Sequence, residues 1–356
     1  PAMENKFKNT FNYAPTAFFS APGRTEIGGN HTDHQNGRVL AAAVDVETTA
    51  AVGLNNSNKI NIMSEGFGMT SVDLTDLAVK PEDYNTTVSL VRGVAAWFAQ
   101  NGTPVKGFDA FVTSDVLPGS GLSSSAAYEV LIGNIINNLF NDDKVDPIQI
   151  AQIAQYTENV YFGKPCGLMD QMASSVGNII TVDFESKANP VVKRLDYDFN
   201  KSGHDLFIIN SGAGHENLTH EYAAIPGEMK SVAAYFGKEV LRQVNKSDFL
   251  AELANIRKQT GDRAVLRALH YFDEDARVGE EVKALSENNF DEFLKVFNRS
   301  AESSWIYLQN VTPKGADFNQ EMAFALALCR SILSGRGGVR VHGGGFAGTI
   351  QAFVPK

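Results

Sequence analysis

The fold of this 356-residue chain is decided by the stretch Val116-Leu117-Pro118-Gly119-Ser120-Gly121-Leu122-Ser123-Ser124-Ser125-Ala126-Ala127. It places a turn, two glycines and three consecutive serines directly before a run of apolar residues at helical spacing. Backbone N–H groups at a helix N-terminus are unpaired and carry partial positive charge, and glycines let the backbone approach an anion closely. Hydroxyls add donors or reach a metal ion. The stretch therefore predicts a phosphate-binding loop, with an ordinary serine cap before a core helix as the alternative.

Two familiar phosphate-binding motifs do not fit this loop. A Walker A loop ends in Gly-Lys-Ser or Gly-Lys-Thr, and no lysine follows Gly121. A dinucleotide-binding fingerprint needs a third glycine at the position where Ser124 stands. The sequence therefore indicates a nucleotide-binding loop of another design.

The composition is that of a globular protein that handles small molecules. Hydrophobic residues make up 43% and charged residues 20% of the chain, and the net charge is −10 without a basic stripe, which argues against nucleic acid as a partner. Cys166 and Cys329 form no disulfide framework and favour a reducing compartment. No apolar run reaches the roughly 18 residues of a membrane-spanning helix. We therefore expect a cytoplasmic protein that binds no membrane, with the oligomeric state open and a monomer as one possibility.

The length of the chain favours two domains. Strand and helix patterns alternate in the first half, and helical periodicity dominates the second, so we predict an α/β fold, expect the boundary between about 180 and 210, and place the domains at 1–205 and 206–356. The expected strands are 38–52, 59–64, 107–114, 178–184, 190–195, 205–210, 340–342 and 349–354. The expected helices are 87–99, 128–140, 148–161, 221–243, 280–299 and 318–333.

A second polar stretch, residues 21–37, reads APGRTEIGGNHTDHQNG. Its polar and charged side chains stand among glycines in one expected loop. They suit a ligand with many hydroxyl groups, because each hydroxyl needs both donors and acceptors. A solvated surface loop is one alternative. A metal site of His31, Asp33 and His34 is another, although no further histidine or cysteine stands nearby to complete it.

Two further segments contain candidate site residues. Asp170 follows the Cys166–Gly167 turn and is a candidate base, with a helix cap as the alternative reading. Glu158 precedes it by twelve residues. The glycine cluster at 343–348 lies between two expected strands and is a weak signal by itself.

Taken in order, these segments resemble the GHMP superfamily of small-molecule kinases. Residues 118–127 look like its ATP loop, and residues 342–349 look like its third motif. Within the superfamily, Pro-Gly-Arg and His-Thr-Asp at 22–33 and Cys-Gly-Leu-Met-Asp-Gln at 166–171 look like galactokinase. The resemblance covers almost the whole chain. It implies a two-domain α/β kinase with its active site in the cleft between the domains, which uses ATP and Mg²⁺ to phosphorylate the C1 hydroxyl of a galactose-type sugar.

The resemblance also implies roles for residues at matching positions. Asp170 is the catalytic carboxylate near the anomeric hydroxyl, and Arg24 stabilises charge on the transferring phosphoryl group. The sugar-binding positions are Asn30, His31, Asp33, the Gly167 backbone and Tyr222. The ATP-binding positions are Pro118, Gly119, Ser120, Gly121, Leu122, Ser123, Ser124 and Ser125. Ser125 and Glu158 match positions that hold Mg²⁺. The set is coherent, because phosphoryl transfer depends on positioning and charge neutralisation more than on covalent chemistry.

The sequence departs from the galactokinase pattern at two places. Asn30 stands where galactokinases usually have a glutamate that contacts the C6 hydroxyl, and the Tyr-Asn-x-Arg-Arg pattern is broken after Tyr222. A neutral asparagine would not repel a C6 carboxylate, and plant galacturonokinases resemble this chain in His-x-Asp-His-Gln. Galacturonate is therefore an alternative substrate to galactose. A non-catalytic sugar sensor is less favoured, because Arg24, Glu158, Asp170 and the serine loop are all present.

Overall fold

The computed structural model describes residues 2–116, 118–164, 166–214 and 218–356. Internal contacts divide the chain into two compact units. The first unit consists of Pro1–Arg24 and Ala43–Gly177, and the second consists of Thr25–Ala42 and Asn178–Lys356. Two long strands, β1 (Ala17–Gly28) and β2 (Arg38–Leu54), therefore contribute residues to both units.

A sheet and the helices packed on it form the first unit. Its strands pair in the order β4-β3-β5-β2, with β3 parallel to β5 and the other pairs antiparallel. The strands are β3 (Lys59–Ser64), β4 (Gly68–Asp73) and β5 (Phe108–Ser114) together with the second part of β2. The helices are α1 (Ala2–Phe11), α2 (Thr87–Gln100), α3 (Ser124–Asn141), α4 (Pro147–Val160) and α5 (Met169–Val176).

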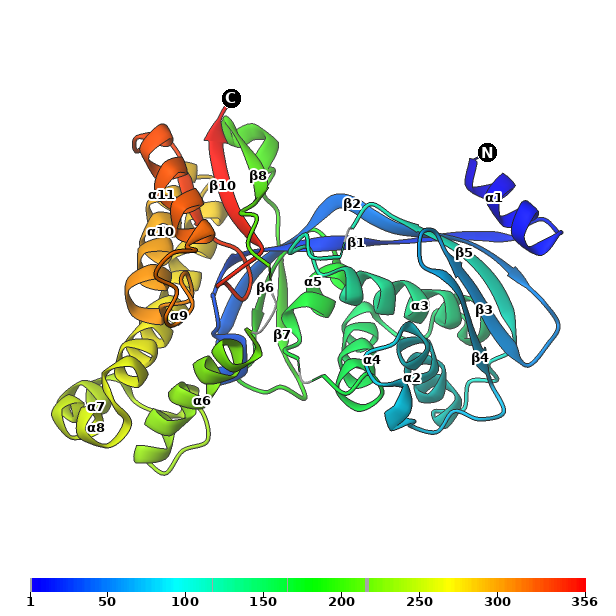
Figure 1. Ribbon diagram of the computed structural model, residues 1–356, viewed down its shortest axis with the longest axis horizontal. Coiled ribbons are helices and arrows are strands. Elements are labelled where there is room, and N and C mark those ends of the chain that lie inside the picture. Colours follow the sequence, from blue (N-terminus) through cyan, green and yellow to red (C-terminus); the bar gives the residue numbers. More distant parts are fainter. Residues whose placement is uncertain (1, 117, 165, 215–217) are drawn as a thin grey trace. The chain divides into compact units, whose positions relative to one another are not determined.

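The core of the first unit lies between the sheet and α2, α3 and α4, which cover one face of the strands (Figure 1). Ile60 and Ile62 of β3 both point into it, because alternate side chains of a strand share a face. Val91, Val94 and Phe98 of α2 are buried at helical spacing. β5 enters the predicted phosphate loop from this core and α3 leaves it, so two packed elements hold the ends of the loop.

The other end of the same seven-stranded sheet, a separate three-stranded sheet and a group of helices form the second unit. The first five residues of β2 pair with β6 (Ile179–Asp183), which pairs with β7 (Val191–Leu195). A separate antiparallel sheet has the order β8-β10-β9, with bounds β8 (His204–Asn210), β9 (Gly338–Val341) and β10 (Thr349–Pro355). The helices are α6 (Thr219–Tyr235), α7 (Lys246–Ala251), α8 (Leu253–Thr260), α9 (Asp262–Ser286), α10 (Phe290–Ser303) and α11 (Glu321–Leu333).

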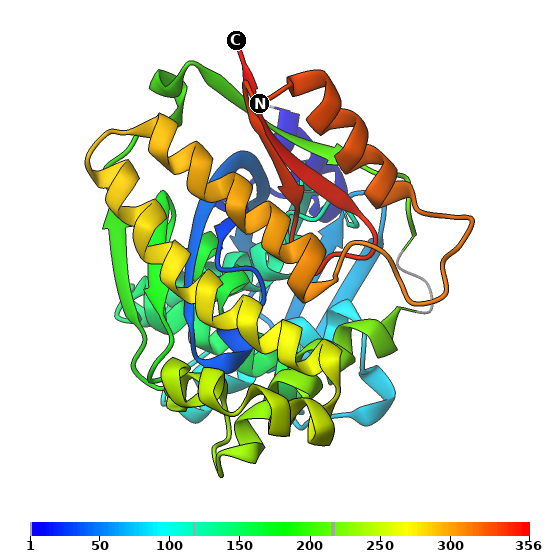
Figure 2. The same cartoon turned by 90° about the vertical axis from the view of Figure 1, so that its left-hand side faces the viewer.

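Helices α9 and α10 form an antiparallel hairpin, seen in yellow and orange in Figure 2. Phe293 and Phe297 of α10 are fully buried and contact Phe353 of β10, which ties the hairpin to the small sheet. A single π-helical segment, η5 (Ser304–Leu308), follows α10. Such segments are rare in proteins, and those that occur frequently lie at functional sites. Here it turns Ser304 toward the buried side chain of Asn30.

The sequence predicted most strands within one or two residues, and four differences have physical reasons. The unit division falls after Gly177 instead of 205, and residues 25–42 belong to the second unit, because the start of β2 pairs with β6. The helix expected at 280–299 is two helices, separated by a turn at 287–289. The helix expected to reach 243 ends at Tyr235. Residues 21–28 are part of β1, so the expected polar loop is limited to 29–37.

Among the helices in the described parts of the chain, none combines the length and the apolar character that crossing a membrane would require.

Candidate active site

The predicted phosphate loop leads directly into α3, which begins at Ser124. Gly119 and Gly121 adopt positive φ angles of 76°, which only glycine adopts easily. Ser123 is the residue before the helix, and its side chain does not cap the helix. The backbone N–H groups of the first turn of α3 therefore lack a side-chain cap, which leaves them suited to an anion.

A cavity of about 360 Å³ lies beside this loop. Its volume falls in the range of small-ligand pockets. Apolar and aromatic side chains form its walls, and hydroxyl groups stand at its edge. The lining residues are Thr48, Ser64, Glu65, Phe67, Asn85, Thr87, Leu90, Val112, Ser114, Val116, Pro118, Ser124, Ser125, Tyr128 and Phe162. Because Pro118, Ser124 and Ser125 are in this lining, the cavity is continuous with the predicted phosphate loop.

Arg24 and Asp170 form an ion pair beside the loop. Arg24 Nε donates to Asp170 Oδ1 at 2.7 Å, and Arg24 Nη1 donates to the carbonyl of Gly121 at 2.7 Å. The Arg24 side chain is 7% exposed and the Asp170 side chain 37%, so the carboxylate is the member that faces solvent. A Cβ atom on Gly23 would lie 3.0 Å from the Leu122 carbonyl. Glycine at 23 therefore lets β1 approach the loop closely.

The surroundings of Asp170 keep it ionised. Desolvation raises its pKa, but the charge of Arg24 and hydrogen bonds from Arg24 and Ser123 outweigh it, so the net pKa is lowered. Ser123 Oγ donates to Asp170 Oδ2 at 2.6 Å. Asp170 also lies in the first turn of α5, where the helix dipole favours a negative charge. An ionised carboxylate at this position can accept a proton from a hydroxyl group.

Glu158 and Glu129 form a buried acidic pair nearby in the same unit. Glu158 Oε2 accepts a hydrogen bond from Gln171 Nε2 at 2.9 Å, and Lys164 Nζ lies 4.0 Å from Oε1. Neither oxygen of Glu129 has a hydrogen-bond partner of ordinary geometry in the described part of the chain. Desolvation and then the charge of Glu158 raise the pKa of Glu129 well above its usual value. Burial therefore favours the protonated form of Glu129, and a cation beside the pair would favour the ionised form.

This donor set fits Mg²⁺. The ion prefers oxygen ligands and is commonly bound by one or two carboxylates together with water and substrate phosphates. Ser125 and Glu158 supply such oxygens, and the unpartnered oxygens of Glu129 lie where a cation would stabilise the ionised carboxylate. Among the residues described, no three His, Cys, Asp or Glu side chains come together as a site that could hold a metal unaided.

Asn30 lies in the second unit and is completely buried. Its Nδ2 donates to Glu26 Oε1 and to the Gly343 carbonyl, both at 2.8 Å. Its Oδ1 accepts from Ser304 Oγ at 3.1 Å and from Asn310 Nδ2 at 2.9 Å. An asparagine amide has two donor hydrogens and two acceptor lone pairs, so all four are used.

Three consecutive carbonyls of the glycine-rich turn accept bonds from predicted sugar-binding residues. Asn30 donates to Gly343, His31 Nε2 lies 2.9 Å from the Gly344 oxygen, and Tyr222 donates to Gly345 at 2.9 Å. The glycines allow this approach. A Cβ on Gly344 would lie 2.9 Å from the Tyr222 ring, and one on Gly345 would lie 2.1 Å from the Asn310 carbonyl. The third motif and the polar loop therefore form one substructure.

A chain of hydrogen bonds fixes His31 and His34. Gln35 Oε1 accepts from the Leu241 N–H, and Gln35 Nε2 lies 3.1 Å from His34 Nδ1. His34 Nε2 lies 3.4 Å from His31 Nδ1, and His31 Nε2 contacts the Gly344 carbonyl. This order requires both rings to be neutral and protonated on Nε2. Desolvation lowers the pKa of His31 to about 4, which agrees with a neutral ring. The ring nitrogens of the two histidines are therefore bonded to each other, to Gln35 and to the Gly344 carbonyl. This arrangement does not match the alternative of a metal site formed with Asp33.

His270 makes the stability of this substructure depend on pH. It is fully buried, contacts the Asn30 carbonyl through Nε2 at 2.8 Å, and has a pKa lowered to about 4 by desolvation. The unfolded chain, with a histidine pKa near 6.5, binds the proton more readily. Stability is therefore fully present above about pH 6.5 and is lost as the pH falls toward 4. We expect His270 to account for about 2 kcal/mol between pH 7.5 and 5, measured as the difference in urea unfolding free energy between wild type and His270→Gln at the two pH values. Equal pH dependence in both proteins would contradict it.

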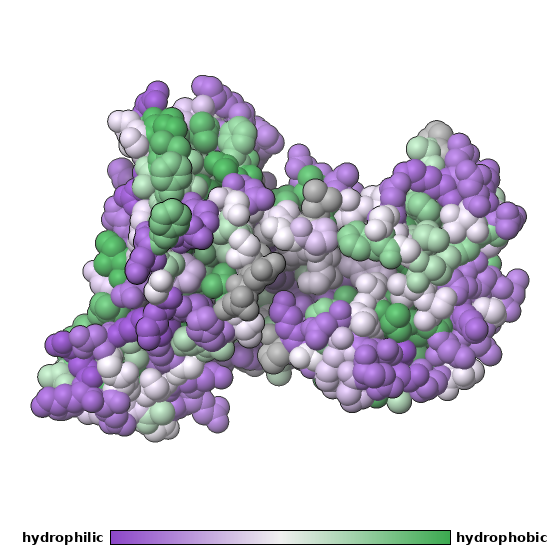
Figure 3. All heavy atoms as spheres, viewed as in Figure 1, coloured by the Kyte–Doolittle hydropathy of each residue, from purple (hydrophilic) through white to green (hydrophobic). Residues whose placement is uncertain are grey.

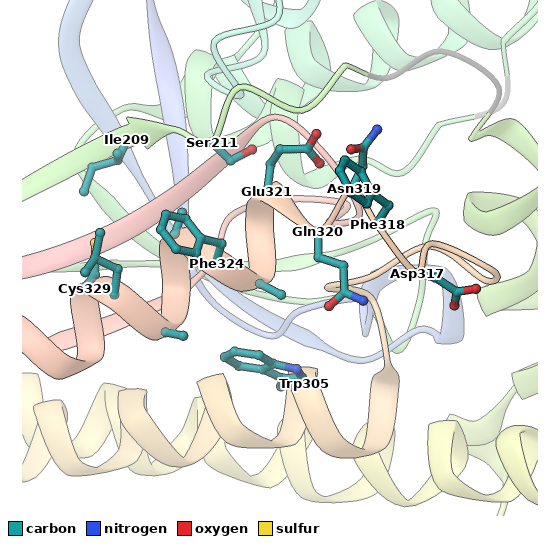
Figure 4. A pocket seen from close by; sticks show the side chains of 14 residues that line it. Ile209, Ser211, Trp305, Asp317, Phe318, Asn319, Gln320, Glu321, Phe324 and Cys329 are labelled. Atoms are coloured by element: carbon teal, nitrogen blue, oxygen red, sulfur yellow. The ribbon is translucent and has the colours of Figure 1, made fainter.

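A large apolar groove of about 910 Å³ lies elsewhere in the second unit. Trp305, Phe324 and Cys329 point into it in Figure 4. Phe318 is 99% and Phe324 70% exposed, and hydrophobic side chains gather over α11 in Figure 3. The groove contains none of the residues predicted for the site, so we place neither nucleotide nor sugar there.

The structure brings the predicted residues together in two groups. Arg24, Asp170 and loop residues 121–123 are joined in the first unit, and Asn30, His31 and Tyr222 are joined in the second. Gly167 is exposed just before α5, and Asp33 Oδ1 accepts from the His34 N–H. The location of the active site between two domains stays a prediction.

Sequence reasoning missed several residues that hold these groups. They are Glu26, Glu129, His270, Ser304 and Asn310. Glu129 had a local signal, because it follows Ser125 by four residues and so shares a face of α3 with it. Glu26 lies within the polar stretch, four residues before Asn30. His270, Ser304 and Asn310 approach from parts of the chain far away in sequence.

Family models and curated relatives show which proteins this chain is similar to. Residues 5–54 match the galactokinase galactose-binding signature, and residues 89–178 match the GHMP kinase N-terminal domain. A galactokinase of Glaesserella parasuis is 30% identical over 364 residues, covering 99% of this chain and 89% of its own length. One of Actinobacillus succinogenes is 29% identical over 366 residues, covering 100% of this chain and 90% of its own.

Solved structures give the same result. Lactococcus lactis galactokinase in complex with galactose has a TM-score of 0.84 at 25% identity, covering 99% of this chain and 89% of its own. Streptococcus pneumoniae phosphomevalonate kinase shares the fold alone, with a TM-score of 0.65 at 11% identity, covering 96% and 92% of the two chains. The predicted α/β GHMP kinase fold is confirmed. The chain belongs to the galactokinase family of GHMP kinases and is a sugar kinase.

Proposed function

We propose that this protein transfers the γ-phosphoryl group of ATP to the C1 hydroxyl of D-galactose, giving galactose 1-phosphate and ADP. The C1 oxygen forms a bond to Pγ while the bond from Pγ to the β,γ-bridging oxygen breaks. The C1 hydroxyl proton passes to the Asp170 carboxylate. Arg24 stays protonated and stabilises the charge that develops on the transferring group.

The observation that carries this proposal is the ion pair of the buried Arg24 with the partly exposed Asp170, held against the phosphate loop. An ionised carboxylate and a fixed guanidinium lie together within 2.7 Å, beside N–H groups suited to phosphate. Phosphoryl transfer requires this combination of an oriented nucleophile and positive charge. The choice of galactose is supported by the names of the relatives and by the galactose complex of the Lactococcus lactis enzyme.

We place ATP with its phosphates on loop residues 118–125 and its base in the adjoining cavity. Ser125 and Glu158 would hold Mg²⁺, which supplies charge neutralisation on the phosphates. Burial raises the pKa of Glu158, although Lys164 and a hydrogen bond from Gln171 oppose this. The adjacent Glu129 carboxyl strengthens the preference of this position for a cation.

We assign the sugar to His31, Asp33, Gly167 and Tyr222, which are all at least partly exposed, and we remove Asn30, which is completely buried. The amide of Asn30 is buried and all its donors and acceptors are used by the protein, so it has nothing left for the C6 group. The same finding removes the reason for expecting galacturonate, and the relatives are galactokinases. The galacturonate alternative therefore gains no support.

The direct test measures ADP release with D-galactose and with D-galacturonate in parallel, each with Mg²⁺ and with excess EDTA. We expect turnover with galactose that EDTA abolishes, and ³¹P NMR of the product should show phosphate on C1. Turnover with galacturonate alone would contradict the choice of sugar. A product phosphorylated elsewhere would contradict the assignment of the reacting hydroxyl.

The assignment of Asn30 predicts the effect of Asn30→Asp. This change removes donors to Glu26 and Gly343 and places a second carboxylate beside that of Glu26, so we expect unfolding free energy to fall by about 3 kcal/mol or more. The galactose-to-galacturonate ratio of kcat/KM should change less than about threefold, since a residue out of reach of the sugar contributes little to discrimination. The exposed Asn319→Asp is the matched control. A stable variant with a reversed preference would overturn the assignment.

A further inference from the structure

Three consecutive residues of the phosphate loop contact the reacting pair. The Gly121 carbonyl accepts from Arg24 Nη1 at 2.7 Å, and the Leu122 carbonyl accepts from the Arg24 N–H at 3.0 Å. The next residue, Ser123, donates through Oγ to Asp170 Oδ2 at 2.6 Å. The loop assigned to ATP is therefore joined directly to the carboxylate assigned to the sugar hydroxyl. A displacement of the loop must change the hydrogen bonds of Asp170.

The backbone of Ser123 is unusual for this contact. It adopts the left-handed conformation, with φ 58° and ψ 62°, which is unfavourable for a residue with a side chain. Thr86 and Asp146 at the starts of α2 and α4 accept hydrogen bonds from their helices, whereas Ser123 does not cap α3. The hydroxyl of Ser123 is directed to Asp170 instead. Strain of this kind persists where surrounding contacts hold it, and it is frequent at active sites.

The Ser123 hydroxyl has a single proton to donate. It cannot donate to Asp170 and to a phosphate oxygen at the same time. In this structure the proton goes to Oδ2, while Oδ1 already accepts from Arg24. We propose that Ser123 is a positioning residue that exchanges partners: without nucleotide it donates to Asp170, and with nucleotide it donates to a phosphate oxygen, releasing Oδ2 for the sugar hydroxyl.

This exchange couples the two substrates, and it rests on the proposed roles of the loop and of Asp170. A nucleotide that takes over the Ser123 hydrogen bond leaves Asp170 with one more free lone pair and a more basic carboxylate, so sugar binds more tightly to the nucleotide complex. Thermodynamic reciprocity requires the nucleotide to bind more tightly to the sugar complex by the same factor. Couplings of this kind are about 5-fold to 150-fold.

The first experiment needs no sugar. A crystal structure of the protein with the Mg²⁺ complex of AMPPNP, a non-hydrolysable ATP analogue, should show Ser123 Oγ within hydrogen-bond distance of a phosphate oxygen and no longer bonded to Asp170. A retained Ser123–Asp170 bond in that complex overturns the proposal, whichever sugar the enzyme uses.

The second experiment measures the coupling by calorimetry, as the Kd of D-galactose with and without saturating Mg–AMPPNP. Wild type should bind galactose at least about fivefold more tightly with nucleotide. Ser123→Ala and Ser123→Gly both lack the hydroxyl, and only glycine also relieves the left-handed backbone. Both variants should bind galactose tightly without nucleotide and show a coupling factor near one.

The outcomes distinguish a failure of the Ser123 partner exchange from a failure of the proposed function. Coupling that persists in both variants overturns the exchange, and coupling lost only in Ser123→Ala assigns it to backbone strain and also overturns it. Wild type that binds AMPPNP but not galactose contradicts the proposed substrate, while the nucleotide complex still decides the partner of Ser123.

Discussion

Replacing Asp170 by asparagine lowers kcat for sugar phosphorylation by about 10²–10⁴-fold, the usual contribution of a positioned acid or base. Asparagine has nearly the same shape and can still accept a hydrogen bond from Ser123, but it cannot take a proton from the sugar. The loss should appear in kcat, because the proton moves only as the reaction proceeds. Steady-state ADP release at saturating ATP and galactose measures it.

The expected loss in Asp170→Asn requires that the fold and the nucleotide site survive. The variant should therefore unfold at a similar urea concentration and bind Mg–AMPPNP with a Kd close to that of wild type. Asp76→Asn, at an exposed carboxylate that pairs with Lys80, is the matched control and should keep wild-type kcat. Activity of Asp170→Asn within threefold of wild type would show that Asp170 is not the base.

Replacing Arg24 by methionine has the second largest expected effect, a loss of about 10²–10³-fold in kcat. Methionine fills much of the same volume but removes the positive charge near the phosphoryl group and the side-chain hydrogen bonds to Asp170 and to Gly121. Arg24→Lys keeps the charge without the planar fork, so it should recover only part of the activity. Arg257→Met, at an exposed ion pair on α8, is the control.

The pH dependence of Arg24→Met distinguishes charge from shape. Desolvation already raises the pKa of Asp170, and Arg24 is the main group that opposes it. Without Arg24 the pKa of Asp170 rises, so the acid limb of kcat/KM against pH moves to higher pH. The stability that this carboxylate contributes is present above its unfolded pKa and is lost as pH falls through the folded one, and this contribution should shrink. A pH profile parallel to that of wild type would contradict the electrostatic role.

Local chemistry let the sequence predict the parts of the site that lie close together along the chain. Backbone conformation and helix capping depend on neighbouring residues. The start of α3 could therefore be predicted from Gly119, Gly121 and the serines that precede the helix. Apolar periodicity gave most strands and helices for the same reason. The turn before Asp170 made this residue a candidate base, and the resemblance to galactokinases supplied its expected role.

Tertiary structure decided what these residues touch. Ser123 was predicted as a phosphate ligand, and the fold turns its hydroxyl to Asp170, 47 residues away. Asn30 was predicted to bind the sugar. The fold instead buries its amide against Ser304 and Asn310, which stand 274 and 280 residues away. No local pattern reports such partners, because packing and hydrogen-bond saturation are properties of the assembled core. The sequence by itself indicated the family and predicted the phosphate loop and the candidate base, whereas only the folded chain decided which polar groups remain free for a ligand.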